Sequence, residues 1–183
     1  MKKDSALFIV DVQNDFLPGG ALGVPRGDEV IGPINRLVTR FDMVLASKDW
    51  HPADTVHFEK WPKHCVRATR GAMFPPSLDV DRIDQLFLKG TGNSDDGYSA
   101  FEATNEDLAF YLRAKGVSTL FVVGLATDYC VMATAVDAVR HGFDTYVIPE
   151  AIRAVNLKAE DEANALENMR NAGVRLIGLE EVV

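Results

Sequence analysis

Six short apolar runs, separated by longer stretches with a helical pattern, constrain the fold of this chain more than any other feature. The runs lie at residues 6–10, 43–46, 85–88, 119–123, 145–148 and 174–177. Continuous runs of this length, rich in β-branched residues, are typical of strands that are buried on both faces, as in parallel sheets. Because helices alternate with these strands over short links, we predict a three-layer α/β/α fold with a six-stranded, mostly parallel sheet.

Four of the intervening stretches have the pattern of helices. They lie at residues 29–41, 105–115, 130–141 and 158–172. Asp28 is the expected N-cap of the first helix, although Pro33 disturbs its first turn. Gly116, Gly142 and Gly173 follow the other three helices, in the position where glycine commonly ends a helix.

One stretch breaks the alternation of strands and helices. Residues 50–84 are rich in proline, histidine and charged side chains, which is typical of a long functional loop. A chain of 183 residues, 47% of them hydrophobic, suits one domain with a sizeable core. We therefore expect a single domain over residues 1–183, with a loop excursion at about 49–84.

Charge and hydropathy exclude several classes of function. The net charge is −8 and no Lys/Arg cluster stands out, so we expect no nucleic-acid partner. The weakly basic start at residues 1–3 precedes an apolar stretch that breaks at Asp11, too soon for a signal peptide. No apolar run approaches the roughly 20 residues of a membrane helix, so we expect no membrane partner. The expected location is the cytoplasm, where Cys65 and Cys130, which could pair, should be free thiols.

Polar side chains gather where the predicted strands end. Asp11 follows the first strand, Lys48 and Asp49 the second, Lys89 the third, and the segment that leads to Cys130 the fourth. Ligands of open parallel sheets bind outside the carboxyl ends of the strands. Taken singly, Asp11 and Lys89 are most simply explained as solvated strand ends. An acid, a base and a thiol at one edge of the sheet instead indicate a catalytic site.

Cys130 has two interpretations. Most free cysteines are small buried hydrophobic side chains. Cys130, however, follows a glycine-containing strand end and opens a predicted helix. The helix dipole should then lower its thiol pKa below the free value of about 8.5, and a nearby Lys89 ammonium should lower it further. Backbone N–H groups at the helix start could also bind an oxyanion, so on this interpretation Cys130 is a nucleophile.

Asp49, His51, His57 and His64 form a candidate metal site within sixteen consecutive positions. Asp49 and His51 are two residues apart and point to the same side of an extended chain. Carboxylate and imidazole ligands suit zinc, iron or manganese. The alternative is a group of surface histidines, but three of the four histidines of the chain fall in this loop beside a carboxylate.

Aromatic side chains lie near the same motifs. They are Phe16, Trp50, Trp61 and Tyr98. Such side chains either belong to the core or form the walls that a flat ring would need.

Four motifs give the chain a family resemblance. They are DVQNDF at 11–16, DWHP at 49–52, WPKHC at 61–65 and GLATDYCV at 124–131. In this order, and over essentially the whole chain, they resemble the isochorismatase-like hydrolases and, within that superfamily, the nicotinamidase/pyrazinamidase branch. The resemblance implies a catalytic triad of Asp11, Lys89 and Cys130.

The resemblance also implies one divalent metal ion, with zinc as the first choice and iron or manganese as alternatives. Its ligands would be Asp49, His51 and His64. His57 matches a position that supplies a further ligand in some members of the family and not in others.

An oxyanion hole and a ring pocket follow from the same resemblance. A cis peptide between Leu125 and Ala126 would aim the N–H groups of Ala126 and Cys130 at the oxyanion. The pocket for the substrate ring would be built from Phe16, Trp61, Tyr98 and Tyr129.

The activity that the resemblance implies is hydrolysis of nicotinamide to nicotinate and ammonia through a cysteine thioester, with the metal orienting the pyridine ring. Pyrazinamide is a further expected substrate, NAD salvage the expected role, and a homo-oligomer the form many related proteins take. Cys130 argues against isochorismatase activity. One alternative is a related cysteine amidohydrolase acting on another small amide or ureido substrate. The other is a non-catalytic metal-binding or redox-sensing protein that uses Cys65 and Cys130.

Overall fold

A six-stranded parallel sheet forms the centre of the computed structural model, which describes residues 4–183, so the basic start at 1–3 lies outside the described residues. The strands are β1 (Ser5–Val10), β2 (Val44–Asp49), β3 (Gln85–Lys89), β4 (Thr119–Leu125), β5 (Asp144–Arg153) and β6 (Arg175–Leu176). Their order is β3-β2-β1-β4-β5-β6, and every neighbouring pair is parallel. The predicted α/β fold with six strands is confirmed.

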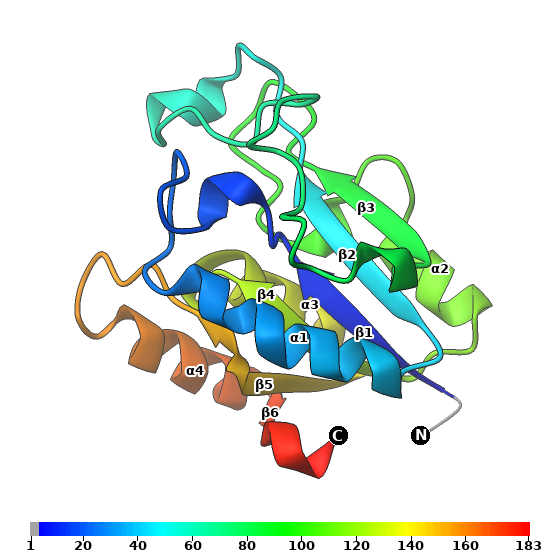
Figure 1. The fold of residues 1–183 in the computed structure, drawn as a ribbon. Helices are drawn as coiled ribbons and strands as arrows, with labels where there is room; N and C mark the ends of the chain where they lie inside the picture. Colours follow the sequence, from blue (N-terminus) through cyan, green and yellow to red (C-terminus); the bar gives the residue numbers. More distant parts are fainter. Residues whose placement is uncertain (1–3) are drawn as a thin grey trace.

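Helices cover both faces of this sheet (Figure 1). They are α1 (Ile31–Leu37), α2 (Leu108–Ala114), α3 (Met132–Arg140) and α4 (Asp161–Ala172). One apolar cluster includes α1, and a second cluster includes α2, α3 and α4. In β1, Leu7 and Ile9 belong to the first cluster, and Ala6, Phe8 and Val10 belong to the second. Both faces of this central strand are buried, which is why its sequence is continuously apolar.

The helices begin later than the sequence predicts. Asp28 lies inside a 3-10 turn that precedes α1 and does not cap it. α2 begins at Leu108 because the Asp107 carboxylate accepts a hydrogen bond from the Phe110 N–H. α3 begins only after a π-helical turn, Thr127–Val131, and this turn contains the residue predicted to open the helix.

Short 3-10 turns supply much of the remaining local structure. They are Asn14–Phe16, Gly27–Val30, Val38–Arg40, Val56–Glu59, Val80–Arg82, Ala100–Glu102 and Leu179–Glu181. The glycines expected after α2, α3 and α4 all have positive φ, as predicted for helix ends. Within the described part of the chain, no helix is long and apolar enough to cross a membrane.

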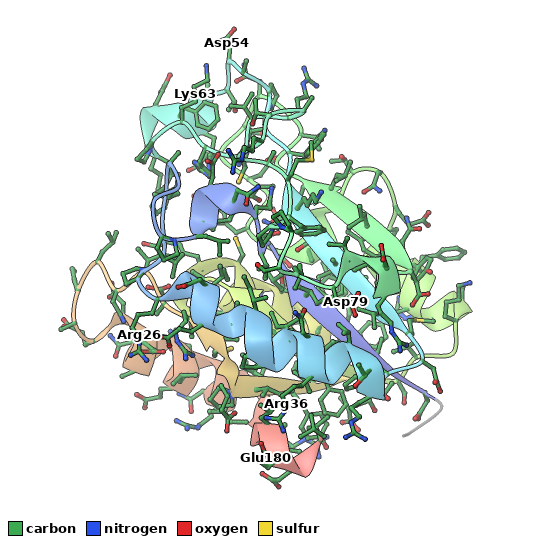
Figure 2. All side chains as sticks on the ribbon, viewed as in Figure 1. Arg26, Arg36, Asp54, Lys63, Asp79 and Glu180 are labelled. Atoms are coloured by element: carbon green, nitrogen blue, oxygen red, sulfur yellow. The ribbon has the colours of Figure 1, made fainter. Side chains whose placement is uncertain are left out.

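The segment between β2 and β3 leaves the sheet near its carboxyl end (Figure 1). A parallel bridge between His51 and Val66 ties its two arms together. Asp54 and Lys63 lie at its outer end and point into solvent (Figure 2). The excursion therefore has an exposed tip and a base that lies against the sheet edge where polar side chains gather.

Gly124 allows β1 and β4 to approach each other where β4 ends. Its φ is +115°, and a Cβ atom there would lie 2.1 Å from the Val10 carbonyl oxygen. A larger residue would push β4 away from β1. The close approach therefore places the turn that follows β4 beside the end of β1.

Candidate active site

Asp11, Lys89 and Cys130 meet at the carboxyl end of the sheet, although they come from three separate elements. Asp11 directly follows β1 with a φ of +46°, Lys89 ends β3, and Cys130 lies in the π-helical turn after β4. The Lys89 ammonium lies 2.7 Å from Asp11 Oδ2 and donates to Cys130 Sγ at 3.4 Å. All three side chains are buried. The structure thus brings together the acid, base and thiol that the sequence places at one edge.

Lys89 also contacts Asp49, the carboxylate of the candidate metal site. The two residues are paired across β2 and β3, and the ammonium forms a close ion pair with Asp49 Oδ1. It further donates to the Gly97 carbonyl oxygen at 2.6 Å. Lys48 takes no part, because its ammonium lies 4.1 Å from the ring centroid of Phe74. One lysine therefore contacts two buried carboxylates, offsets one of their two charges and joins the two candidate sites.

Burial and charge set the protonation of the carboxylates and the lysine. Burial raises the pKa of Asp11 to about 6 against the attraction of Lys89, and the charge of Asp49 adds to the rise. Burial also opposes ionisation of Asp49, but the Lys89 ammonium and the nearby His51 imidazole outweigh it and hold this pKa well below its usual range. Burial likewise disfavours the Lys89 ammonium, but the two carboxylates prevail and raise its pKa well above the usual value.

The Cys130 thiol differs from expectation. Its pKa is raised well above the usual value, because burial outweighs the lowering effect of Lys89 and the charges of Asp11 and Asp49 add to the rise. The predicted lowering of this pKa is therefore wrong. A thiol in this setting needs a base to become a nucleophile, and a carboxylate oxygen of Asp11 lies within 4.8 Å of Cys130 Sγ.

Three imidazole rings converge beside this cluster. One ring nitrogen from each of His51, His57 and His64 lies within 4.8 Å of the other two. All three rings are buried. Burial lowers the pKa of both His57 and His64, which favours the neutral imidazole that binds metals. The structure therefore places His57 with the other two histidines.

Each of these rings is oriented through its Nδ1 atom. The acceptors are Gly90 O for His51 at 2.9 Å, Asp95 Oδ1 for His57 at 2.9 Å and Pro62 O for His64 at 2.6 Å. An acceptor at Nδ1 places the hydrogen on that atom and leaves the Nε2 lone pair free. Asp49 Oδ2 lies 3.6 Å from His51 Nε2 and 3.8 Å from His64 Nε2. The Asp49 carboxylate therefore lies beside two of the three converging imidazoles.

His51 Nε2 provides a test of whether a metal ion suits these residues. This buried atom has no hydrogen-bond partner among residues 4–183. A buried polar atom without a partner is costly, and a bound cation would satisfy its lone pair. Three imidazoles and one carboxylate are also ligands that divalent zinc, iron and manganese accept. The residues present therefore fit a divalent metal ion.

An aromatic cavity opens between the thiol and the imidazoles. It encloses about 500 Å³ of free space, including its open mouth. The four aromatic residues assigned to the ring pocket, Phe16, Trp61, Tyr98 and Tyr129, all line it, together with Cys130. Trp50 is not among the residues that line the cavity, and its half-buried side chain instead packs against the first apolar cluster.

The Leu125–Ala126 peptide is cis, as the family resemblance implies. The Ala126 carbonyl oxygen accepts hydrogen bonds from the N–H groups of Tyr129 and Val131 at 3.1 Å each. Those two N–H groups are therefore occupied. Ala126 and Cys130 both line the cavity beside the thiol.

Three supporting side chains have no role in the sequence-based prediction. The buried Gln13 amide donates to the Asp49 carbonyl oxygen and accepts from the Asp49 N–H, both at 2.8 Å. Ser47 Oγ donates to Asp11 Oδ1 at 2.8 Å. The sequence pointed to Gln13 and Ser47 as site residues. Gln13 lies in the first motif, and Ser47 is two residues before Asp49 on the same strand face. Asp95 lies in a polar loop that gives no such signal.

A model of the isochorismatase domain matches residues 5–181 of this sequence. The chain belongs to the isochorismatase family. Within that family it belongs with the nicotinamidases, which are hydrolases of amide C–N bonds. The nicotinamidase/pyrazinamidase of Mycobacterium tuberculosis is 42% identical over 185 residues, which cover 94% of this chain and 97% of the relative.

Solved structures support the assignment of the chain to this family. The pyrazinamidase of Pyrococcus horikoshii in complex with zinc has 41% identity and a TM-score of 0.87, and the match covers 96% of this chain and 99% of that one. PnC1 from L. infantum in complex with nicotinate has 33% identity and a TM-score of 0.93, with 100% of this chain and 96% of that one covered.

Proposed function

We propose that this hydrolase converts nicotinamide to nicotinate and ammonia through a thioester on Cys130, and that it also accepts pyrazinamide. The observation that carries the proposal is that a thiol and three converging imidazoles line one aromatic cavity, with the buried Asp11 carboxylate beside the thiol. The names of the relatives and the nicotinate bound to PnC1 from L. infantum support the choice of substrate.

The proposed reaction begins with Asp11. Ionised above its pKa of about 6, Asp11 removes the thiol proton of Cys130 as Sγ attacks the carboxamide carbon. The N–H groups of Ala126 and Cys130 stabilise the oxyanion. Asp11 then gives the proton to the departing nitrogen, which leaves as ammonia. Water, deprotonated by Asp11, hydrolyses the thioester to nicotinate and restores the thiol.

Lys89 has two roles in the proposed reaction, one toward the base and one toward the thiolate. Its ammonium, 2.7 Å from Asp11 Oδ2, opposes the rise in the Asp11 pKa that burial causes and keeps the base ionised near neutral pH. The same ammonium lies 3.4 Å from Cys130 Sγ and offsets the charge of the thiolate as it forms.

Asp49, His51, His57 and His64 would hold the metal, and we infer zinc as the ion. A bound divalent ion would supply a Lewis-acid anchor for the pyridine nitrogen and so orient the ring. The donor set and the zinc complex of the Pyrococcus horikoshii pyrazinamidase support this inference.

Phe16, Trp61, Tyr98 and Tyr129 would enclose the flat ring. Their side chains line the cavity from four separate segments, and the rings of Trp61 and Tyr129 meet edge to face at 5.1 Å. Aromatic walls favour a planar apolar ring over a flexible aliphatic amide.

The proposal includes a setting for the enzyme. We place residues 1–183 in one isochorismatase-like hydrolase domain, whose excursion at about 49–84 supplies metal ligands. We assign the enzyme to NAD salvage. We place it in the cytoplasm, because both of its cysteines are free thiols. A homo-oligomer is compatible with this role.

The test is release of ammonia and nicotinate from nicotinamide by purified, zinc-loaded protein, with Cys130→Ala as the matched control. The proposal requires both products from the wild type and neither from the variant. If neither product appeared with zinc bound and the thiol reduced, nicotinamide would be ruled out as the substrate. A panel of other small amides and ureido compounds, measured in parallel, would then identify the alternative.

A further inference from the structure

The Asp95 carboxylate connects the imidazole cluster with the aromatic wall of the cavity. Its Oδ1 atom lies 2.9 Å from His57 Nδ1 and accepts a hydrogen bond from the Tyr98 hydroxyl at 2.8 Å. Its Oδ2 atom accepts a hydrogen bond from the Lys60 ammonium at 3.2 Å. One carboxylate therefore fixes a proposed metal ligand and a proposed ring-pocket residue.

The contact with His57 differs from those that orient the other two imidazoles. His51 and His64 are held by backbone carbonyl oxygens, which no side-chain substitution removes. His57 is held by the side chain of Asp95. A carboxylate at Nδ1 fixes the tautomer that leaves Nε2 as the ligand atom, and it orients the ring. It also makes the imidazole more basic and so a stronger metal ligand.

The contact with Tyr98 extends to a second wall of the cavity. The Tyr98 hydroxyl accepts hydrogen bonds from Trp61 Nε1 at 2.9 Å and from the Lys60 ammonium at 3.2 Å. The polar ends of the Tyr98 and Trp61 rings are thus engaged with each other and with Asp95, while both side chains line the cavity. Removing the carboxylate takes away the acceptor that holds the Tyr98 hydroxyl.

We propose that Asp95 is a positioning residue that fixes His57 as a metal ligand and, through Tyr98, holds the Trp61 wall of the ring pocket. Metal affinity and ring binding then depend on the same carboxylate. This inference rests on the proposed function, because it takes the imidazoles as metal ligands and the aromatic cavity as the ring site.

The experiment measures zinc affinity by chelator competition and the visible spectrum of the cobalt-substituted protein. Asp95→Ala should weaken zinc binding by about 10- to 100-fold and alter the cobalt spectrum, since loss of a carboxylate behind a ligating imidazole has effects of this size. Glu59→Ala is the matched control, because it removes an exposed carboxylate two residues from His57. It should change neither the affinity nor the spectrum.

Tyr98→Phe separates the two halves of the inference. It removes the hydroxyl but leaves the contact between Asp95 and His57 in place. It should weaken nicotinate binding to the zinc-loaded protein, measured by calorimetry, without changing zinc affinity. Asp95→Ala at saturating zinc should weaken nicotinate binding as well.

Two outcomes would overturn the inference in different ways. If the wild type binds zinc and Asp95→Ala binds it equally well with the same cobalt spectrum, the inference alone fails. If the wild type binds no divalent metal, the proposed metal role fails and the inference falls with it.

Discussion

Replacing Asp11 with asparagine should stabilise the fold at alkaline pH, although it should also abolish turnover. Burial, reinforced by Asp49 and opposed by Lys89, raises the Asp11 pKa from 3.8 to about 6. The folded protein therefore holds this proton more tightly than the unfolded chain does. At about 1.4 kcal/mol per pKa unit, this rise makes the ionised carboxylate cost the folded state about 3 kcal/mol.

The pH dependence has a definite sign. The contribution of the raised pKa to stability is complete below about pH 3.8 and is lost as the pH rises through about 6. Asparagine has nearly the same volume as aspartate and stays neutral throughout this range. The gain in the free energy of unfolding for Asp11→Asn should therefore grow from under about 1 kcal/mol at pH 4 to about 3 kcal/mol at pH 8.

Urea titrations of both proteins between pH 4 and pH 8, with a chelator present, would measure this difference without a contribution from metal loss. Asp54→Asn is the control, because it removes a carboxylate from the exposed tip of the excursion (Figure 2). Its effect should not grow with pH. A gain for Asp11→Asn that is independent of pH, or a loss of stability at pH 8, would refute the argument from burial.

Three further predictions concern the proposed roles of single residues. Ser47→Ala removes a hydrogen bond that favours ionised Asp11, so the acidic limb of the pH profile of kcat/KM should move up by about 1 pH unit. An unchanged limb would contradict the assignment of Asp11 as the base. His51→Ala should lose bound zinc in elemental analysis while its circular dichroism is retained, and unchanged zinc content would remove His51 from the ligand set. Cys130→Ala should bind nicotinate in calorimetry but release no ammonia from nicotinamide, and turnover above background would argue against the covalent route.

The strands and the polar edge of the sheet were predictable because both follow from local sequence. A strand buried on both faces needs a continuous apolar run, so Asp11 marks the end of β1 and Lys89 the end of β3. Parallel strands then bring these ends to one edge. The pairing of Asp49 with Lys89 depends on the register of β2 and β3, which the two runs alone do not specify.

The thiol pKa was not predictable, because it is a balance of terms that only the folded structure supplies. Sequence position suggests a helix dipole and a nearby ammonium, and both would lower the pKa of Cys130. The folded chain adds burial and two nearby carboxylates, and these raise it. The contacts of Asp95 escaped prediction for a similar reason, because the loop that carries it meets His57 only in the folded chain.

The central claim is that Cys130 carries the acyl group during hydrolysis of nicotinamide. Acid quenching of the zinc-loaded enzyme during turnover, followed by intact-mass and peptide mass spectrometry, would test it directly. The account predicts a mass increase of one nicotinoyl group on the peptide that contains Cys130, absent from Cys130→Ala and from protein incubated with nicotinate alone. The claim would be contradicted if Cys130→Ala turned over nicotinamide as fast as the wild type and no acyl group were found on that peptide of the wild type during turnover.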